Sequence, residues 1–412
     1  MSTLLACVLA LSAAQAPASD RVTLWTDDAL FLVEEYERRH PRPWFGCPRE
    51  EFERSMDVFL AGIEAWSEER TCAEFLRLFA RIAEQGRDGH SGIWPTQGGM
   101  LPLQLYWFVD GWFVVAADEP ELVGAQVTAL GGVPIGEATE RLAPLLTRDN
   151  EWNLRDQLAL ALAGTTLLAG VGIPCTEAGL AMTFVRGGKS EERRIAAQRL
   201  DVGALSFRHG LPTRPGVRWL AQREQAFRYE VLEPEKTLYL QFNEVTARDA
   251  HGRALADFAA EVVRVFGERE CQRLVLDVRS NGGGDNTTFG PLIDALKAPP
   301  FERHGTVFAL IGRGTFSAAG NFVTALERDT HAILIGEPTG GAPNQYGDAQ
   351  TVVLPNHKDL LVRVSTRYHE FSRADDARLT HEPHLSVPLR SSDYFTDQDP
   401  VLAAALAYVP PK

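Results

Sequence analysis

The sequence predicts an α/β protein whose C-terminal half is a layered sheet with helices on it, preceded by a helical segment and a β-rich module. Three observations support this. From Lys236 onward, short apolar runs of strand length alternate with amphipathic helical patterns. Before residue 85, apolar residues recur at helical spacing, and between residues 101 and 130 aromatic and β-branched residues form short strand-like runs. Alternating strands and helices are typical of a layered α/β domain.

The first eighteen residues, Met1 to Ala18, are typical of a secretory signal peptide. An apolar run from Leu4 to Leu11 is followed by small residues that fit a cleavage site. No Lys or Arg precedes the run, so an apolar N-terminus of a cytosolic protein is the alternative. We expect export to the periplasm or the extracellular space. No stretch of the chain reaches the ~20 apolar residues that a membrane-spanning helix needs.

Residues 19–95 are expected to form a helical domain that ends in a polar, glycine-rich loop. Thr26 can cap a first helix that ends at His40, and Phe52 to Trp66 has one apolar face. A third helix is expected to open with a capping box at Thr71 and to run past Ile82. The loop over residues 85–92 contains His90.

Residues 96–200 are expected to form a β-rich module. An aromatic hairpin is predicted over residues 103–115, with its turn at Asp110 and Gly111, and a strand over residues 126–130 precedes a helix over 136–146. The aromatic side chains can line a ligand site, but core packing is the favoured interpretation. Residues 201–235 have no clear period and are predicted to be a linker.

Residues 236–412 have the α/β pattern. Strands are expected at 237–242, 274–278, 307–311 and 332–335, and helices at 254–266 and 317–328.

Charge and cysteine content exclude several classes of partner and cofactor. With 41 basic and 55 acidic residues the net charge is −14, and no Lys/Arg cluster is present, which argues against nucleic acid and anionic membranes. Cys7 would leave with the signal peptide. The other four cysteines, Cys47, Cys72, Cys175 and Cys271, contain no C-x-x-C, so a zinc site is not expected. They can pair in any of three ways or remain buried thiols.

Two glycine-rich loops, each leaving a predicted strand, are the candidates for chemistry. The first contains Gly282, Gly283 and Gly284, and the second leads into Ser317 at the start of a helix. The free N–H of Ala318 and the helix dipole favour negative charge beside Ser317, as an acyl-transfer oxyanion requires. The alternatives are a plain tight turn for the first loop and a simple N-cap for Ser317.

Several motifs in register resemble the C-terminal processing, or tail-specific, serine peptidases. The segments that carry the resemblance are 274–284, 315–320, 334–341, 382–387 and 399–402. The resemblance implies a crotonase/ClpP-like catalytic core, a Ser317 nucleophile and no metal or cofactor. Residues 124–132 resemble part of a degenerate PDZ module, which that family often carries.

The chain departs from the family's Ser–Lys branch. The turn that carries the lysine there reads Gly-Gly-Ala-Pro-Asn-Gln over residues 340–345, and none of the five lysines occupies the matching place. Residues 88–92 resemble the loop from which the tricorn branch supplies a histidine, which makes His90 the expected base. The carboxylate that holds this histidine in the tricorn branch corresponds to Asp376, with Asp375 or Glu370 as alternatives.

We therefore expect a serine peptidase that cleaves peptide or protein substrates through an acyl-enzyme. The backbone N–H groups of Ala318 and Gly283 are expected to hold the oxyanion. Two alternatives remain open. One is a non-catalytic ligand-binding protein on the same fold, as the interphotoreceptor retinoid-binding protein is; the other is an esterase or amidase.

Overall fold

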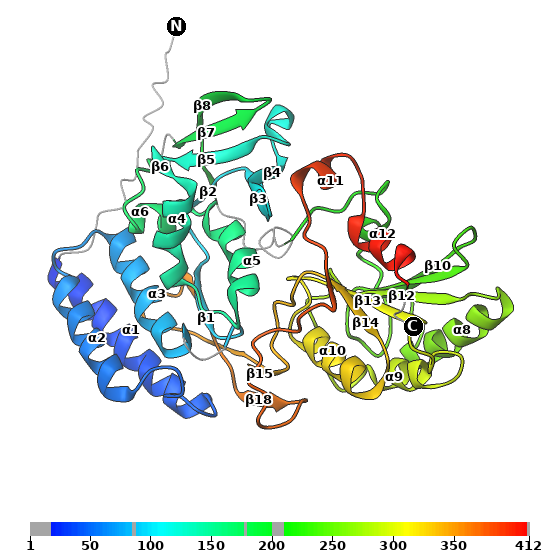
Figure 1. The fold of residues 1–412 in the computed structure, drawn as a ribbon. Helices are drawn as coiled ribbons and strands as arrows, with labels where there is room; N and C mark the ends of the chain where they lie inside the picture. Colours follow the sequence, from blue (N-terminus) through cyan, green and yellow to red (C-terminus); the bar gives the residue numbers. More distant parts are fainter. Residues whose placement is uncertain (1–17, 85–87, 177–178, 200–209, 410–412) are drawn as a thin grey trace, which may run out of the picture.

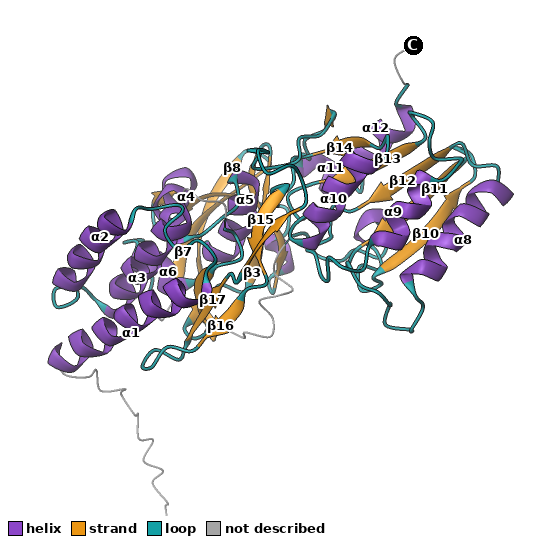
Figure 2. Ribbon diagram, turned by 90° about the horizontal axis from the view of Figure 1, so that it is seen from below, coloured by secondary structure: helices purple, strands orange, loops and turns teal. Residues whose placement is uncertain are grey.

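The chain builds two lobes side by side (Figures 1 and 2). The structure, a computed structural model, describes residues 18–84, 88–176, 179–199 and 210–409. We call residues 18–199 the N-terminal lobe and residues 210–409 the C-terminal lobe. The expected signal peptide lies outside the described residues except for Ala18.

Three helices form one side of the N-terminal lobe: α1 (Ala18–Arg39), α2 (Arg49–Gly62) and α3 (Glu68–Glu84). The helix starts differ from those expected. Thr26 lies inside α1, and α3 begins before Thr71. Ser67 takes the capping role because its hydroxyl accepts a hydrogen bond from the Arg70 N–H at 3.2 Å. Thr71 instead donates to the Ser67 carbonyl, at 2.9 Å.

An antiparallel sheet forms the other side of this lobe (Figure 1). Its strands, in sheet order, are β3 (Leu103–Phe108), β4 (Gly111–Ala117), β5 (Gln126–Leu130), β7 (Leu180–Arg186) and β8 (Lys189–Ile195). The strands β3, β4 and β5 and the helix α4 (Ile135–Leu142) agree with the expected elements. Two helices were not anticipated, α5 (Glu151–Ala161) and α6 (Thr165–Gly170).

The C-terminal lobe is a six-stranded sheet between two layers of helices. Its strands, in sheet order, are β10 (Phe227–Leu232), β11 (Thr237–Phe242), β12 (Arg273–Asp277), β13 (Val307–Ile311), β14 (Ile333–Gly336) and β19 (Leu385–Ser386). All pairs are parallel except β10 with β11. One face packs against α8 (Leu255–Glu268), α9 (Gly290–Lys297) and α10 (Ala318–Asp329), and the other against α12 (Pro400–Ala407).

The segment 201–235, expected to be a linker, contributes the edge strand β10. The full length of this strand pairs with β11, from Phe227 opposite Phe242 to Leu232 opposite Thr237. Only its two ends are buried, while the residues between are half-buried. Because this edge strand mixes polar and apolar residues, its sequence has no clear period that would predict a strand.

Part of the C-terminal segment crosses back onto the N-terminal lobe. Strand β15 (Asn344–Gly347) pairs with β18 (Arg367–Glu370) between the lobes, as Figure 1 shows. Beyond them, β17 (Leu360–Val364) pairs with both β16 (Gln350–Val352) and β1 (Gly92–Pro95). The β16–β17 side chains share a hydrophobic core with α1–α3 and β3, so residues 350–364 pack with the N-terminal lobe and not with the rest of 236–412.

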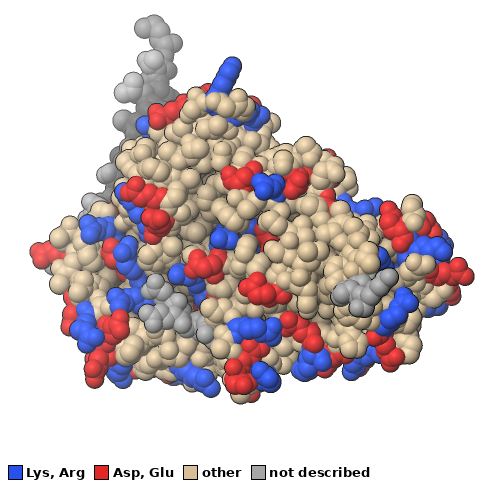
Figure 3. Space-filling view, viewed as in Figure 1, with Lys and Arg blue, Asp and Glu red and all other residues tan. Residues whose placement is uncertain are grey.

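The surface of the described part of the chain carries charges of both signs, and its cysteines form no disulfide bond. The face in Figure 3 intersperses basic and acidic side chains. Among the described residues, no helix is both long and apolar enough to cross a membrane. Cys47, Cys72, Cys175 and Cys271 are free thiols, and all but Cys175 are buried.

Candidate active site

Ser317 stands at a sharp strand-to-helix corner between β13 and α10. Its backbone has φ 56° and ψ −129°, a conformation that non-glycine residues rarely adopt and that is found where function requires strain. It occupies the N-cap position, but its hydroxyl makes no capping hydrogen bond. Its carbonyl accepts from the Gln345 amide at 2.7 Å, so the turn that carries the lysine in the Ser–Lys branch here supports the serine backbone.

His90 reaches Ser317 from the other lobe. Its Nε2 lies 2.8 Å from the Ser317 Oγ, a hydrogen bond across 227 residues of sequence. The imidazole stacks on the Phe316 ring, with centroids 4.5 Å apart. Burial lowers the pKa of His90 to about 4, so the ring is neutral at neutral pH and can accept the Ser317 proton. Its Nδ1 has no hydrogen-bond partner among the described residues.

Asp88 fixes the backbone of the His90 loop. Its Oδ1 accepts from the N–H groups of His90 (3.2 Å) and Ser91 (3.0 Å) and from the Ser365 hydroxyl (2.7 Å). Its Oδ2 lies 3.3 Å from His40 Nε2. Burial alone would raise the pKa of Asp88, but the bonds from His40, Ser91 and Ser365 lower it, so the carboxylate is ionised. Its position two residues before His90 was the signal that could have identified it.

Asp149 supports the same loop from the segment before α5. Its Oδ1 accepts from the Gly89 N–H at 2.6 Å. Burial raises the pKa of Asp149 to about 8, although the bond from Gly89 acts in the opposite direction, so the group is largely protonated at neutral pH. No sequence pattern marked this residue.

The glycine loop touches Ser317 but does not supply the expected donor. A Cβ on Gly283, where φ is +114°, would lie 2.7 Å from the Ser317 Cβ, so only glycine fits there. The N–H of Gly283, however, donates to Asn281 Oδ1 at 3.0 Å, so this expected oxyanion donor is already engaged. Gly282 lines the adjoining cavity, and the Ala318 N–H is a first-turn donor that the helix leaves unpaired.

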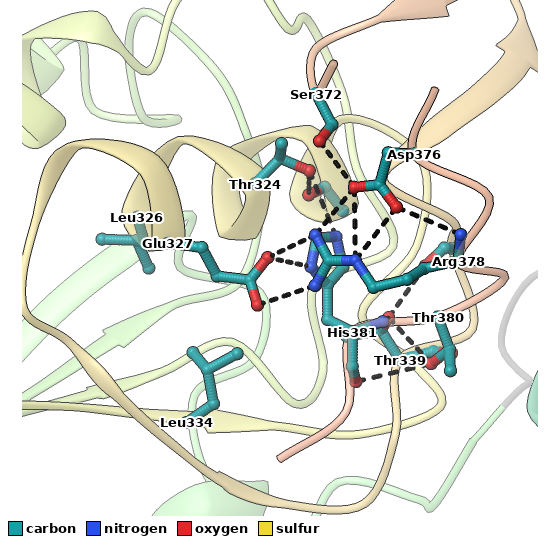
Figure 4. Close-up of polar contacts among 12 residues, drawn as sticks. Thr324, Leu326, Glu327, Leu334, Thr339, Ser372, Asp376, Arg378, Thr380 and His381 are labelled. Atoms are coloured by element: carbon teal, nitrogen blue, oxygen red, sulfur yellow. Dashed lines mark hydrogen bonds and ion pairs between the residues drawn. The ribbon is translucent and has the colours of Figure 1, made fainter. Parts of the chain in front are cut away.

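Asp376, expected to hold His90, is engaged elsewhere. Figure 4 shows its carboxylate between Ser372 and Arg378. It accepts from the Ser372 hydroxyl at 2.6 Å and pairs with Arg378 at 2.9 Å, and Arg378 in turn bridges to Glu327 of α10. The bonds from Arg378 hold the pKa of Asp376 well below its usual range. This segment packs along α10, so the assignment of Asp376 to His90 is wrong.

The two alternatives to Asp376 do not contact His90 either. Asp375 is exposed and pairs with Arg373 at 3.2 Å. Glu370 is exposed on β18, where successive side chains alternate between faces. In the described part of the chain, no carboxylate is hydrogen-bonded to the His90 ring.

A second histidine, His369, approaches the site from β18. A Cβ placed on Gly347 would lie 3.2 Å from His369 Nε2 and 4.0 Å from His90 Nε2, so the two rings share the space that this glycine leaves open. Asn286 lies 3.2 Å from His369 Nδ1, and Asp348 lies 3.3 Å from Nε2. The site thus contains a histidine that the sequence analysis missed, because only the β15–β18 pairing brings it there.

A cavity of about 660 Å³ lies between the lobes beside this pair. His90 and Trp94 come from the N-terminal lobe, whereas Gly282 and Phe316 come from the C-terminal lobe. Its size suits several residues of a peptide or a small ligand. Among the described residues, no group of three or more His, Cys, Asp or Glu side chains is arranged to hold a metal ion.

No protein-family profile matches the chain, and no curated protein sequence matches it. Solved structures do. Mature CPAF complexed with lactacystin is 13% identical, with a TM-score of 0.62 over 93% of this chain and 99% of that chain. A serine-to-alanine mutant of CPAF is 12% identical, with a TM-score of 0.65 over 95% of this chain and 99% of that chain. The chain therefore has the mixed α/β fold that the resemblance to the C-terminal processing peptidases predicts.

Proposed function

We propose that this protein is a serine peptidase in which Ser317 is the nucleophile and His90 the general base. The observation that carries the proposal is the 2.8 Å contact between His90 Nε2 and Ser317 Oγ, made by two loops from different lobes. A strained serine at a helix start and a neutral imidazole in hydrogen-bond reach are the parts that acyl transfer needs.

The reaction follows from these positions. His90 Nε2 accepts the hydroxyl proton as Ser317 Oγ attacks the peptide carbonyl carbon. The resulting oxyanion accepts hydrogen bonds from the Ala318 N–H and from the glycine loop, for which Gly282 replaces Gly283 as the donor. His90 then protonates the leaving amine as the C–N bond breaks. Water next attacks the acyl carbon while His90 takes its proton, and His90 returns this proton to Ser317 Oγ as the acyl–oxygen bond breaks and the carboxylic acid product leaves.

The fold comparison supports the proposal without deciding it. CPAF has been solved with lactacystin and as a serine-to-alanine mutant, and the present chain covers almost all of that structure. We extend the proposal to export through residues 1–18 and to a degenerate PDZ-like role for residues 96–200, a range that contains the strands β3, β4, β5, β7 and β8 of the antiparallel sheet.

Peptide hydrolysis by Ser317→Ala and His90→Ala tests the proposal. Each variant should lose about 10³-fold or more in kcat, and the double variant should be no slower than either single one, because the two groups act as a unit. Ser190→Ala and His304→Ala, both at exposed positions, should match the wild type. Wild-type rates in both site variants would refute the assignment. Parallel assays on casein and nitrophenyl esters separate a peptidase from an esterase.

A further inference from the structure

The cavity beside His90 is lined by basic side chains in a protein of net charge −14. Four arginines line it: Arg223, Arg279, Arg313 and Arg363. Among the described lining residues, Asp156 is the one carboxylate.

Two of the four arginines are fully committed to carboxylates. Arg279 pairs with Asp277 at 2.6 Å and with Asp399 at 2.8 Å. Arg313 pairs with Glu337 at 2.8 Å. Separating a buried guanidinium from such partners is costly, so these two groups are not available to a ligand.

Among the described residues, the other two arginines have only backbone carbonyls as hydrogen-bond partners. Arg223 donates to the Leu211 carbonyl, and Arg363 donates to the Ala349 carbonyl at 2.8 Å. Neither is ion-paired with a carboxylate in the described part of the chain. Arg223 is half-buried, and burial lowers its pKa, although the charge of Asp156 acts partly in the opposite direction.

The two unpaired cations lie along the wall that leads to the catalytic pair. Arg363 is on β17, opposite Gly92 of β1, and Gly92 follows His90 by two residues. Arg223 lies beside Gly210 and Leu211 on the cavity wall. Arg363 is exposed, whereas Arg223 is half-buried. A partly desolvated guanidinium such as that of Arg223 is costly without a counter-ion, and its planar fork matches a carboxylate.

We propose that the cavity binds a carboxylate of the substrate, with Arg223 as the specificity-determining residue and the exposed Arg363 of β17 as a second cation. This inference rests on the proposed function and specifies its substrate class as peptides with a carboxylate close to the scissile bond. The carboxylate can belong to an acidic side chain or to the peptide C-terminus.

Matched peptides test the proposal and separate the two sources. One arm compares Glu with Gln at each position flanking the cleaved bond, and the other compares a free C-terminal acid with its amide. We expect the wild type to prefer the charged member of one pair by about 10- to 100-fold in kcat/KM, mainly through KM. Arg223→Gln should bring this ratio close to one, and Arg223→Lys should retain part of it.

Controls keep the outcomes distinct. Arg303→Gln, at an exposed position outside the cavity, should keep the full preference, and thermal unfolding shows whether Arg223→Gln folds. The same peptides are titrated against Ser317→Ala by fluorescence anisotropy, so the binding preference is measured even if nothing is cleaved. Equal kcat/KM for both members of every pair, or a preference unchanged in Arg223→Gln, would overturn the carboxylate site while leaving the peptidase proposal intact. Absence of cleavage with a preserved binding preference would overturn the peptidase proposal alone.

Discussion

At the scale of single residues, the site depends on groups that support His90 more than on groups that touch its ring. Asp149 accepts from the Gly89 N–H, Asp88 accepts from the N–H groups of His90 and Ser91, and the ring itself contacts Ser317 and Phe316. The histidine is therefore positioned by its loop and by stacking. A loop held in this way is sensitive to the protonation of its supports.

The raised pKa of Asp149 predicts that the folded protein loses stability as the pH becomes alkaline. Its folded-state pKa of about 8 is above its unfolded value, so the folded state holds this proton more tightly. The stability is fully present below about pH 4 and is lost as pH rises through about 8, by about 1 kcal/mol between pH 7 and pH 9. Urea unfolding of Asp149→Asn, which stays neutral, should lack this component. If the wild type and Asp149→Asn lose equal stability over that interval, Asp149 is not protonated as described.

The absence of a side chain at Gly347 leaves space for the rings of His369 and His90, so we expect a larger residue there to displace them. In Gly347→Ala, the new Cβ would lie 3.1 Å from His369 Cδ2, and relief of this contact moves the ring beside His90. We expect kcat to fall by about 10- to 100-fold, because small misplacement of a catalytic group is expensive. Gly267→Ala on α8 meets no atom within 4 Å and should keep full activity. Equal kcat values for the two alanine variants would show that the space at Gly347 has no catalytic role.

At the scale of elements, the β16–β17 hairpin joins the C-terminal segment to the helices of the N-terminal lobe. His357, in the turn between these strands, stacks on Trp25 with centroids 3.7 Å apart and lies 2.7 Å from Asp28. Its Nε2 is 3.6 Å from Glu68. His357 thus links the hairpin to α1 and α3. Strand β17 of the same hairpin pairs with β1, which directly follows the His90 loop.

The His357 link predicts a second pH effect on stability. Burial alone would lower the pKa of His357, but hydrogen bonds to Asp28 and Glu68 raise it to about 9. A raised histidine pKa stabilises fully below about pH 6.5, and the contribution disappears as pH rises through about 9. We expect a loss of about 1–2 kcal/mol from pH 7 to pH 10 that His357→Gln lacks. His304→Gln, at an exposed position, should follow the wild type; a wild-type pH dependence in His357→Gln would contradict the assignment.

The sequence predicted elements whose pattern is local and missed those set by tertiary contacts. The buried strands β11–β14 and the Ser317 corner follow from apolar runs and small residues, and the resemblance pointed to His90. Strand β10 was missed because edge strands mix polar and apolar residues. Asp149 and His369 were missed because contacts between distant segments bring them to the site, and no residue spacing in the sequence indicates those contacts. Asp376 was misassigned because its place in the sequence does not show that it packs along α10.

At the scale of the whole molecule, each lobe contributes one member of the proposed catalytic pair. The C-terminal lobe supplies Ser317, and the N-terminal lobe supplies His90 on a loop that is held in place partly by Ser365, just after β17. Residues of both lobes line the interlobe cavity in which we propose that the substrate binds. Catalysis on this account requires the two lobes to be docked.

Labelling with a fluorophosphonate measures most directly whether His90 activates Ser317. We predict that the wild type forms one adduct, located on Ser317 by mass spectrometry, at a rate that rises with pH through about 4 as His90 loses its proton. In His90→Ala the second-order rate constant should fall by about 10²–10⁴-fold. An adduct on another residue, or a His90→Ala protein labelled as fast as the wild type, would contradict the account.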